Sequence, residues 1–449
     1  METTGSTIKS IFQSNTARLI MVMVLILVLL IPLSFVQSLI NERANRKKEV
    51  IEEVSQKYGE RVYFYGPIIK VPYKTVSESL QVNEITKVPT TVRTMETNYA
   101  YFFPDELKGT GNVQTKPLHR SIYNVSVYSA KLNFSGEFST LDFSSENVSP
   151  ENIQWNKASI LIKTSNLKSI KNAVKINFNN SNYTFEPIRT SETNESIYEG
   201  LETQPIDLSA FATTAKKFTF EIEYDGSQQM MFIPIGKTTQ ISMQSNWADP
   251  SFTGYFLPDD KTKKITKKGF EATWNMSHIN RAFGQQYFTT LPNLDSYSFG
   301  VNFVVPVDEY QKSERASKYG FLVIGLTFLI FYLIQTMSKI NIHIFQYSMI
   351  GLALVMFYTL LISITEHSSF SLAYIIAGFS VIALIGWYSV SVLASKKFPM
   401  FIIASLTALY SFIFVIIQLE NYALLVGSIG LFIILGLVMY FSKKIDWNN

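Results

Sequence analysis

The chain has 449 residues, of which 47% are hydrophobic and 14% aromatic, while only 16% carry a charged side chain. This composition is too apolar for an ordinary soluble protein and indicates a membrane protein. The formal net charge of +4 is small for this length and argues against a nucleic-acid partner, and the lack of cysteine excludes disulfide bridges and thiol chemistry.

The first predicted element is a membrane anchor at residues 19–40. The stretch "LIMVMVLILVLLIPLSFVQSLI" contains no charged residue, and a helix of this length spans the ~30 Å hydrocarbon core of a bilayer. Its apolar run is longer than the core of a cleaved signal peptide, and no A-x-A site follows it. We therefore expect a short N-terminal segment at residues 1–18 and a retained transmembrane helix at 19–40.

Residues 41–318 contain no comparable apolar run and are predicted to form one large polar domain. The domain opens with "NERANRKKEVIEEVSQKYG", in which apolar side chains recur at helical spacing from Val50 to Tyr58 and Gly59 can end the helix. This pattern indicates that a helix continues from the anchor into the domain.

Alternating apolar and polar residues dominate the rest of this domain. The clearest cases are "KFTFEIEY", "GFEATWNM" and "YSFGVNFVV", which span Phe218–Tyr224, Phe270–Met276 and Tyr297–Val305. We expect these segments to be strands of one antiparallel β core, in which Trp274 is buried.

Two local signals refine the predicted strands. Asp225-Gly226 is a sequence typical of a hairpin turn. In "NVSVYSAKLNFSGEF" the inward-facing set changes phase between Val127 and Ala130, which predicts a bulge or a strand break.

The C-terminal part, residues 319–449, is predicted to be a bundle of five transmembrane helices, near 319–337, 345–364, 370–394, 398–418 and 422–442. With the anchor, the expected fold is an integral membrane α-helical protein, with six transmembrane helices arranged 1+5 and a large inserted antiparallel β-rich extracytoplasmic domain, α+β overall.

The basic residues near the spans predict their orientation. One set of helix ends carries Lys9, Arg18, Lys339, Lys396, Lys397, Lys443 and Lys444, whereas the opposite hairpins, "TEHSS" and "LEN", contain neither lysine nor arginine. By the positive-inside rule both termini lie in the cytoplasm and residues 41–318 lie outside. The basic run "NERANRKK" points the other way, but long domains are translocated largely regardless of charge.

The candidate functional residues lie at span ends. Glu366 and His367 occupy one outer hairpin and Glu420 the other, and a second set lies about one bilayer away, at the cytoplasmic ends: His343, Gln346 and Tyr347. Ionisable residues near a membrane are candidates for function. For Glu366 and His367 three interpretations stay open: a polar turn, a contact with the exported domain or a partner, and a proton or metal site.

The second interpretation, a contact of Glu366 and His367 with the exported domain, predicts specific partner residues. The domain returns to the membrane through "YQKSERASKYG", which brings Lys312, Arg315 and Lys318 as countercharges for the outer hairpin. Such a pair at headgroup level contributes on the order of 1 kcal/mol or less.

Known catalytic patterns are incomplete in this sequence. "GKTT" at Gly236 lacks the first glycine of a phosphate loop, whose place is taken by Met231, and Ser363 replaces the first histidine that a zinc site at Glu366-His367 requires. The predicted span interiors contain no Asp, Glu, Lys, Arg or His. We therefore predict a protein that is not an enzyme and uses no cofactor and no metal.

Long ordered blocks carry a family resemblance. The segments "INIHIFQYSMIGLALVMFYTLLISITEHSSFSLAY" and "IQLENYALLVGSIGLFIILGLVMYFSKKIDW" resemble the C-terminal half of the CreD family. The blocks "GPIIKVPY", "YFFPDEL", "HRSIYNVSVYSAKLNFSGEF", "NWADPSFTGYFLP" and "WNMSHINR" agree with it. The resemblance implies a bacterial inner-membrane protein linked to cell-envelope integrity, envelope stress, β-lactam response and colicin tolerance.

Two classes of function fit these observations. The first is a non-enzymatic envelope protein whose periplasmic domain binds or senses a periplasmic or inner-membrane partner. The second is a transporter, or an enzyme that acts on lipid or envelope, which uses the C-terminal bundle and needs an open, polar-lined cavity. The first is favoured, because most of the chain lies in the exported domain and the spans lack catalytic polar groups.

Overall fold

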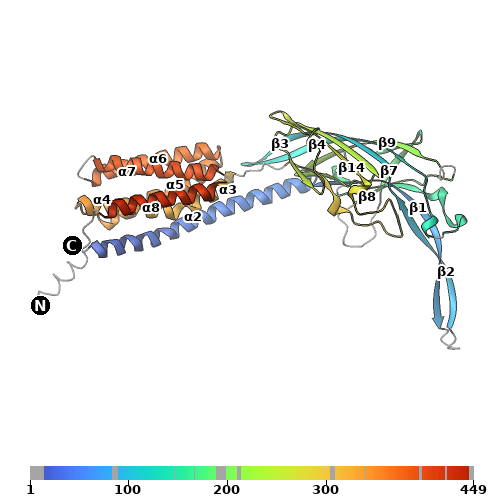
Figure 1. Ribbon diagram of the computed structural model, residues 1–449, viewed down its shortest axis with the longest axis horizontal. Helices are drawn as coiled ribbons and strands as arrows, with labels where there is room; N and C mark the ends of the chain where they lie inside the picture. The colour runs from blue at the N-terminus through green and yellow to red at the C-terminus, as the bar shows by residue number, and fades with distance from the viewer. Residues whose placement is uncertain are drawn as a thin grey trace. The chain divides into compact units, whose positions relative to one another are not determined.

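A computed structural model describes residues 15–82, 89–146, 148–165, 167–188, 199–209, 214–303, 309–338, 340–393, 397–419 and 422–443 (Figure 1). The chain divides into two compact units. The helical unit comprises Met1–Glu49 and Val307–Asn449, and the sheet unit comprises Val50–Pro306.

The first helix, α2 (Asn15–Tyr58), contributes to both units, because the boundary at Val50 falls inside it. It ends where Gly59 adopts a φ of +118°, a conformation that favours glycine, and the Gly59 N–H donates to the Ser55 carbonyl over 3.0 Å. The predicted continuation of the anchor helix as far as Tyr58 is confirmed.

The rest of the helical unit consists of α3 (Glu309–Lys318), α4 (Gly320–Ser338), α5 (Ile344–Thr365), α6 (Phe370–Val392), α7 (Lys397–Gln418) and α8 (Ala423–Ser442). Among the described residues six helices, α2 and α4 to α8, are long and apolar enough to cross a membrane. The six predicted spans are confirmed as helices. The short helix α3 is amphipathic and buries Tyr310, Ser313, Ala316 and Ser317.

Aromatic rings and one glycine hold the helices close together on one side of the helical unit. The Phe357 ring of α5 lies 5.1 Å from the Tyr374 ring of α6 and 4.6 Å from the Tyr410 ring of α7. Gly351 of α5 faces Leu29 of α2 so closely that a Cβ would clash with the leucine side chain. Small residues allow such close approach of helices in a membrane.

The sheet unit contains the strands β1 (Val62–Val82), β2 (Pro89–Phe102), β3 (Glu106–Arg120), β4 (Tyr123–Phe138), β5 (Ser159–Thr164), β6 (Lys175–Phe178), β7 (Ser181–Ile188), β8 (Glu199–Thr203), β9 (Lys216–Ser227), β10 (Gln229–Phe232), β11 (Thr238–Ser245), β12 (Ser251–Gly254), β13 (Lys264–Thr266), β14 (Gly269–Ser277), β15 (Gln286–Phe288) and β16 (Phe299–Asn302). Their main path runs β12-β16-β10-β1-β5-β8-β7-β6-β9-β4-β3-β11-β14-β13, and β2 pairs with β1 and β15. Most pairs are antiparallel as predicted, but β1 pairs with β10, and β3 with β11, in parallel.

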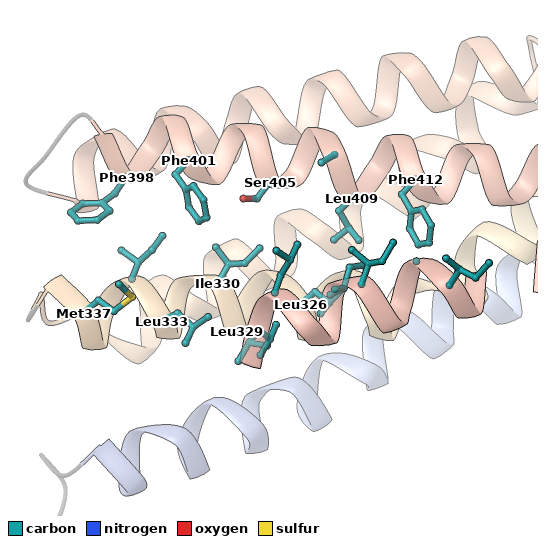
Figure 2. A pocket seen from close by; sticks show the side chains of 18 of the residues that line it. Leu326, Leu329, Ile330, Leu333, Met337, Phe398, Phe401, Ser405, Leu409 and Phe412 are labelled. Atoms are coloured by element: carbon teal, nitrogen blue, oxygen red, sulfur yellow. The ribbon is translucent and has the colours of Figure 1, made fainter. Parts of the chain in front are cut away.

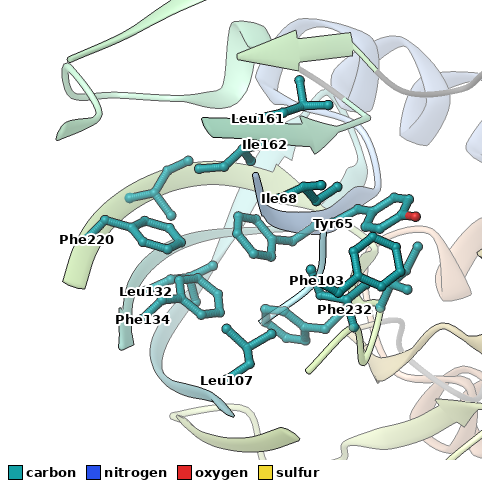
Figure 3. Packing of buried hydrophobic residues seen from close by; sticks show 14 of the residues in the cluster. Tyr65, Ile68, Phe103, Leu107, Leu132, Phe134, Leu161, Ile162, Phe220 and Phe232 are labelled. Atoms are coloured by element: carbon teal, nitrogen blue, oxygen red, sulfur yellow. The ribbon is translucent and has the colours of Figure 1, made fainter. Parts of the chain in front are cut away.

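The core of the sheet unit is one continuous apolar cluster (Figure 3). Phe134 of β4 stacks on Phe64 of β1, at 4.4 Å between ring centroids, and on Phe220 of β9, at 4.9 Å. Trp274 of β14 is 1% exposed, which confirms its predicted burial. Burial of aromatic side chains is the main source of stability in a domain that has no cysteine to cross-link.

The predicted strands hold in two cases and partly in the third. Phe218–Tyr224 lies in β9 and Phe270–Met276 in β14, with alternating burial in both. In the third segment Phe299–Asn302 forms the strand β16, whereas Tyr297 belongs to the 3₁₀ turn Asp295–Tyr297. Val304 and Val305 lie outside the described residues.

Both refinements of the strand pattern are wrong. Asp225 and Gly226 do not turn but continue β9, paired with Ser129 and Tyr128 of β4. Gly226 is needed there because the Tyr128 ring occupies the place of a Cβ. The phase change in β4 is real but involves no bulge, since its register with β3 is unbroken and both faces of β4 are buried at Val127 and Tyr128.

Candidate functional site

The α5–α6 hairpin of the helical unit carries two of the predicted functional residues, Glu366 and His367. Glu366 ends α5 as its C-cap, and α6 begins at Phe370 with Ser369 as its N-cap. The Glu366 side chain is only 17% exposed, whereas His367 is exposed. The two adjacent residues therefore have different environments.

Glu366 forms an ion pair with α2 rather than with α3. Its Oε1 lies 3.3 Å from Nε of Arg43, a residue of the basic run "NERANRKK". Of the expected countercharges, Lys318 pairs within α3 with Glu314, at 2.9 Å. The docking role of the hairpin stays a prediction, but its partner in the structure is Arg43.

A second carboxylate joins α3 to the same hairpin. Oε2 of Glu309, the first residue of α3, accepts the N–H of Phe370 over 2.9 Å. An anionic group at a helix N-terminus is stabilised by the unpaired N–H groups and by the helix dipole. The negative charge of Glu309, from α3, thus stabilises the N-terminal turn of α6.

The helices α2 and α3 also contact each other directly. Nε2 of Gln37 donates to the Ser317 carbonyl over 3.1 Å, and Nζ of Lys47 lies 5.7 Å from the centre of the Tyr310 ring. Together with Arg43–Glu366 and Glu309–Phe370, these contacts close a ring of interactions. We call this ring the hairpin clamp.

The second predicted set lies at the opposite end of α5 and serves its start. His343 Nδ1 accepts the Phe345 N–H over 3.2 Å, and Gln346 Oε1 accepts the His343 N–H over 2.9 Å, which forms a capping box. The Tyr347 hydroxyl donates to Gln335 of α4 over 2.8 Å, in a buried contact. The structure thus separates this set from the hairpin clamp by the length of α5. Glu420 lies outside the described residues.

The sheet unit contains an ion pair that the sequence did not reveal. Nζ of Lys70 donates to both carboxylate oxygens of Glu202, at 3.0 and 3.1 Å, and Ser159, opposite Lys70 in the β1–β5 register, donates to the same carboxylate. Both charged groups are mostly buried, and Nζ lies 4.5 Å from the centre of the Tyr99 ring. Burial and the nearby Glu202 raise the pKa of Tyr101 to about 12.

This cluster is better suited to structure than to catalysis. A serine beside a lysine suggests a nucleophile and a base, but the Lys70 ammonium and the Ser159 hydroxyl both donate to Glu202 and not to each other. The residues come from β1, β5 and β8 and are far apart in the sequence. No local motif signals them.

Arg281 is a second buried cation that sequence reasoning missed. It is 7% exposed, and its guanidinium donates to the carbonyls of Ile235, Gly236 and Phe283 over 3.0 to 3.2 Å. The group lies 3.8 Å from the centre of the Phe283 ring, and burial lowers the pKa of Arg281 to about 10, so it stays charged near neutral pH. Its position at the end of "WNMSHINR", directly after a predicted strand, is the one signal in the sequence.

The far part of the β1–β2 pair projects away from the other strands of the sheet unit (Figure 1). Beyond Lys74 and Asn98 the two strands pair only with each other among the described strands, and we call residues 74–82 and 89–98 the ribbon. One face of the ribbon carries Val76, Leu80 and Met95, which are 54%, 74% and 63% exposed, and the Glu78–Arg93 ion pair lies between them on the same face. A two-stranded ribbon is marginal in water, and exposed apolar side chains beside charged ones are typical of a binding surface.

Comparison with known proteins defines the family. The sequence model described as "Inner membrane protein CreD" matches residues 14–448. The chain belongs to the CreD family. A relative of the same description from Escherichia coli (strain K12) is 28% identical over 421 residues, which cover 93% of this chain and 90% of the relative.

Likeness to solved structures is weak. The alignment with a putative nutrient binding protein from Legionella pneumophila covers 50% of this chain and 73% of that protein, at 9% identity and a TM-score of 0.23. The alignment with an M1 zinc metallopeptidase from Deinococcus radiodurans covers 49% of this chain and 53% of the peptidase, at 8% identity and a TM-score of 0.19. Neither likeness carries a functional argument.

Proposed function

We propose that this CreD family protein is a non-enzymatic component of the inner membrane that supports envelope integrity under stress. In this proposal the sheet unit binds a partner outside the cytoplasm, and the helical unit responds to that binding. The observation that carries the proposal is the hairpin clamp. The exposed Val76, Leu80 and Met95 of the ribbon support a binding role for the sheet unit.

The clamp joins both connections of the sheet unit to one element. The chain enters the sheet unit through α2 and leaves it toward α3. Arg43 of α2 pairs with Glu366, and Glu309 of α3 binds the N–H of Phe370. A displacement of either connection therefore acts on the α5–α6 hairpin, which gives binding in one unit a physical route to the other.

The contacts of the hairpin clamp are weak enough to break and re-form when the sheet unit binds a partner. Arg43 and Glu366 are 43% and 17% exposed at their side chains, so solvent screens the pair and its contribution is about 1 kcal/mol or less. Coupling free energies between sites are typically ~1–3 kcal/mol. Several contacts of this size can couple the units without locking them.

Transport or envelope chemistry by the bundle receives less support. A polar solute needs a pathway with polar groups, but the cavity between α4, α7 and α8 is lined by apolar side chains apart from Ser405 and Lys397. In the sheet unit, the serine and lysine that resemble a catalytic pair are both bound to Glu202. The first observation counts against transport of a polar solute by the bundle, and the second counts against catalysis by the serine and lysine.

We also propose that both termini lie in the cytoplasm and that residues 41–318 lie in the periplasm. The argument is the distribution of basic residues over the two sets of helix ends. Reporter fusions after residue 200 and at residue 449 test the orientation. A periplasmic C-terminus or a cytoplasmic residue 200 contradicts it.

The clamp itself is tested by charge reversal in a strain that lacks the chromosomal copy. We expect Arg43→Glu and Glu366→Arg each to reduce growth on a β-lactam and on bile salt, because each places like charges together. The double variant restores the pair with opposite polarity and should recover most of the resistance. Cysteines introduced near residues 43 and 368 report by crosslinking whether the contact forms.

The matched control is the ion pair within α3. Reversing Glu314 and Lys318, singly or together, changes the same charges on an exposed helix face and should leave resistance unchanged. If the single reversals at Arg43 and Glu366 are harmless, or if the double reversal is as impaired as the singles while all variants reach the membrane, the proposal fails.

A further inference from the structure

The helical unit contains a long apolar groove between α4, α7 and α8 (Figure 2). Its volume is about 860 Å³, at the upper end of the ~300–1,000 Å³ typical of ligand pockets. The groove is open at the surface of the helical unit, since Phe401, Ile429 and Ile433 in its lining are 49%, 53% and 56% exposed. A molecule from the surrounding membrane can therefore enter it and become its occupant.

The lining of the groove excludes water as that occupant. Leu326, Ile330 and Leu333 of α4 face Phe401, Leu409 and Phe412 of α7 across it (Figure 2). A buried water needs about 2 to 4 polar partners, and Ser405 is the only neutral polar side chain in the lining. Such a lining favours a hydrocarbon occupant.

The shape of the groove specifies a single long chain. On α7 the lining extends from Lys397 to Phe412, which at ~1.5 Å per residue is roughly 22 Å of helix. Half of a ~30 Å hydrocarbon core is roughly 15 Å. The groove is thus long enough for an extended acyl chain.

The charge at one end of the groove specifies the headgroup. Lys397, the first residue of α7, is exposed and lines the groove, and Met337 of α4 lies at the same end. The opposite end, at Leu326 and Val426, is apolar. A cation at one end of a hydrocarbon groove complements a lipid phosphate.

We propose that the α4–α7–α8 groove binds one acyl chain of an anionic phospholipid, with the phosphate at Lys397. The bound lipid becomes part of the packing of the helical unit and attaches α8 to α4 and α7. The chain fills the space that the side chains leave, and the headgroup sets which end of the lipid enters.

The experiment uses the full-length protein purified in a mild detergent. Native mass spectrometry counts retained lipids, and lipid extraction identifies them. Ser405→Phe places a ring in the groove, and we expect it to reduce the retained phospholipid by about tenfold, which corresponds to ~1.4 kcal/mol of binding free energy. Lys397→Gln should retain lipid but lose the preference for phosphatidylglycerol over phosphatidylcholine in exchange assays.

Each variant has a control with the same chemical change elsewhere. Ser380→Phe alters an exposed serine of α6, outside the groove, and Lys443→Gln removes an exposed lysine after α8. We expect both to behave as the wild type. A fluorescence melt of all four variants shows that a lost lipid reflects a blocked groove and not an unfolded protein.

Three results overturn the proposal. Equal lipid retention in Ser405→Phe and Ser380→Phe means that the chain binds elsewhere or that α8 closes the groove. A polyprenyl phosphate in place of phospholipid means that the groove serves another lipid. Dimers that are lost in Ser405→Phe mean that a second copy of the chain occupies it.

Discussion

The sheet unit and the α4–α7–α8 face of the helical unit differ in how closely their apolar side chains meet. In the sheet unit Phe64, Phe134 and Phe220 stack at centroid distances of 4.4 and 4.9 Å. In the helical unit a groove of about 860 Å³ lies between α4, α7 and α8, and no residue in the most apolar window of the described α8 segment Ala423–Tyr440 is buried in the protein.

The difference reflects the solvent of each region. In water, apolar side chains pack together because exposing them costs about 25 cal/mol per Å². In a bilayer the surrounding lipid is as apolar as leucine, so the same side chains gain little from contact with each other. Close packing is therefore necessary in the sheet unit and optional in the helical unit, where lipid can take the place of side chains.

The largest expected difference in stability is between alanine substitutions at two tryptophans, one in each unit. Trp274→Ala removes a side chain that is 1% exposed in the sheet core and should lower the free energy of unfolding by ~3–5 kcal/mol. Trp387→Ala makes the same change at a residue of α6 that is 73% exposed, and should have little effect in a bilayer. Hydrogen–deuterium exchange in the full-length protein measures the first variant at the β14 amides and the second at the α6 amides. An equal loss of protection relative to the wild type at the two sites refutes the comparison.

A substitution at Arg281 tests whether buried hydrogen bonds in the loops of the sheet unit contribute as much to stability as its apolar core does. Arg281→Lys keeps the charge but cannot reach three backbone carbonyls, and we expect a loss of about 1.5–3 kcal/mol. Arg93→Lys, on the exposed ribbon, should change stability by less than about 0.5 kcal/mol. Urea titration with a fluorescence readout gives both values, and equal midpoints count against a structural role for Arg281.

Two glycines compare the regions at the scale of one methyl group. Gly226→Ala forces a Cβ into the Tyr128 ring and should cost about 1–3 kcal/mol. Gly436→Ala in α8 meets no atom within 4 Å, and should be neutral or stabilising by up to ~1 kcal/mol because alanine favours helix. Melting temperatures of the two variants measure the difference, and we expect the lower value for Gly226→Ala. A larger drop in melting temperature for Gly436→Ala means that α8 packs tightly.

The smallest expected change concerns the ribbon, where apolar side chains face water in the sheet unit. Replacing Val76 and Met95 with threonine should alter stability by no more than about 0.5 kcal/mol, because both are exposed. A photocrosslinker at Leu80 should capture a partner in native membranes, and the double variant should reduce that capture. A loss above about 1 kcal/mol would show that the ribbon packs against something in the free protein.

The sequence by itself determined the elements that depend on local pattern. Uninterrupted apolar runs identified the six spans, because a membrane helix must satisfy its backbone within one segment. Helical spacing from Val50 to Tyr58 with Gly59 identified the extension of α2. Alternation identified β9 and β14, and ordered blocks identified the family.

The tertiary structure alone decided what depends on residues distant in the chain. Gly226 resembled a turn because turns and close approaches both favour glycine, and only the Tyr128 ring shows which one applies. Glu366 pairs with Arg43, more than three hundred residues earlier, although Lys312, Arg315 and Lys318 are closer along the chain. The groove between α4, α7 and α8 has no sequence signature, since leucines that face lipid and leucines that line a groove obey the same periodicity.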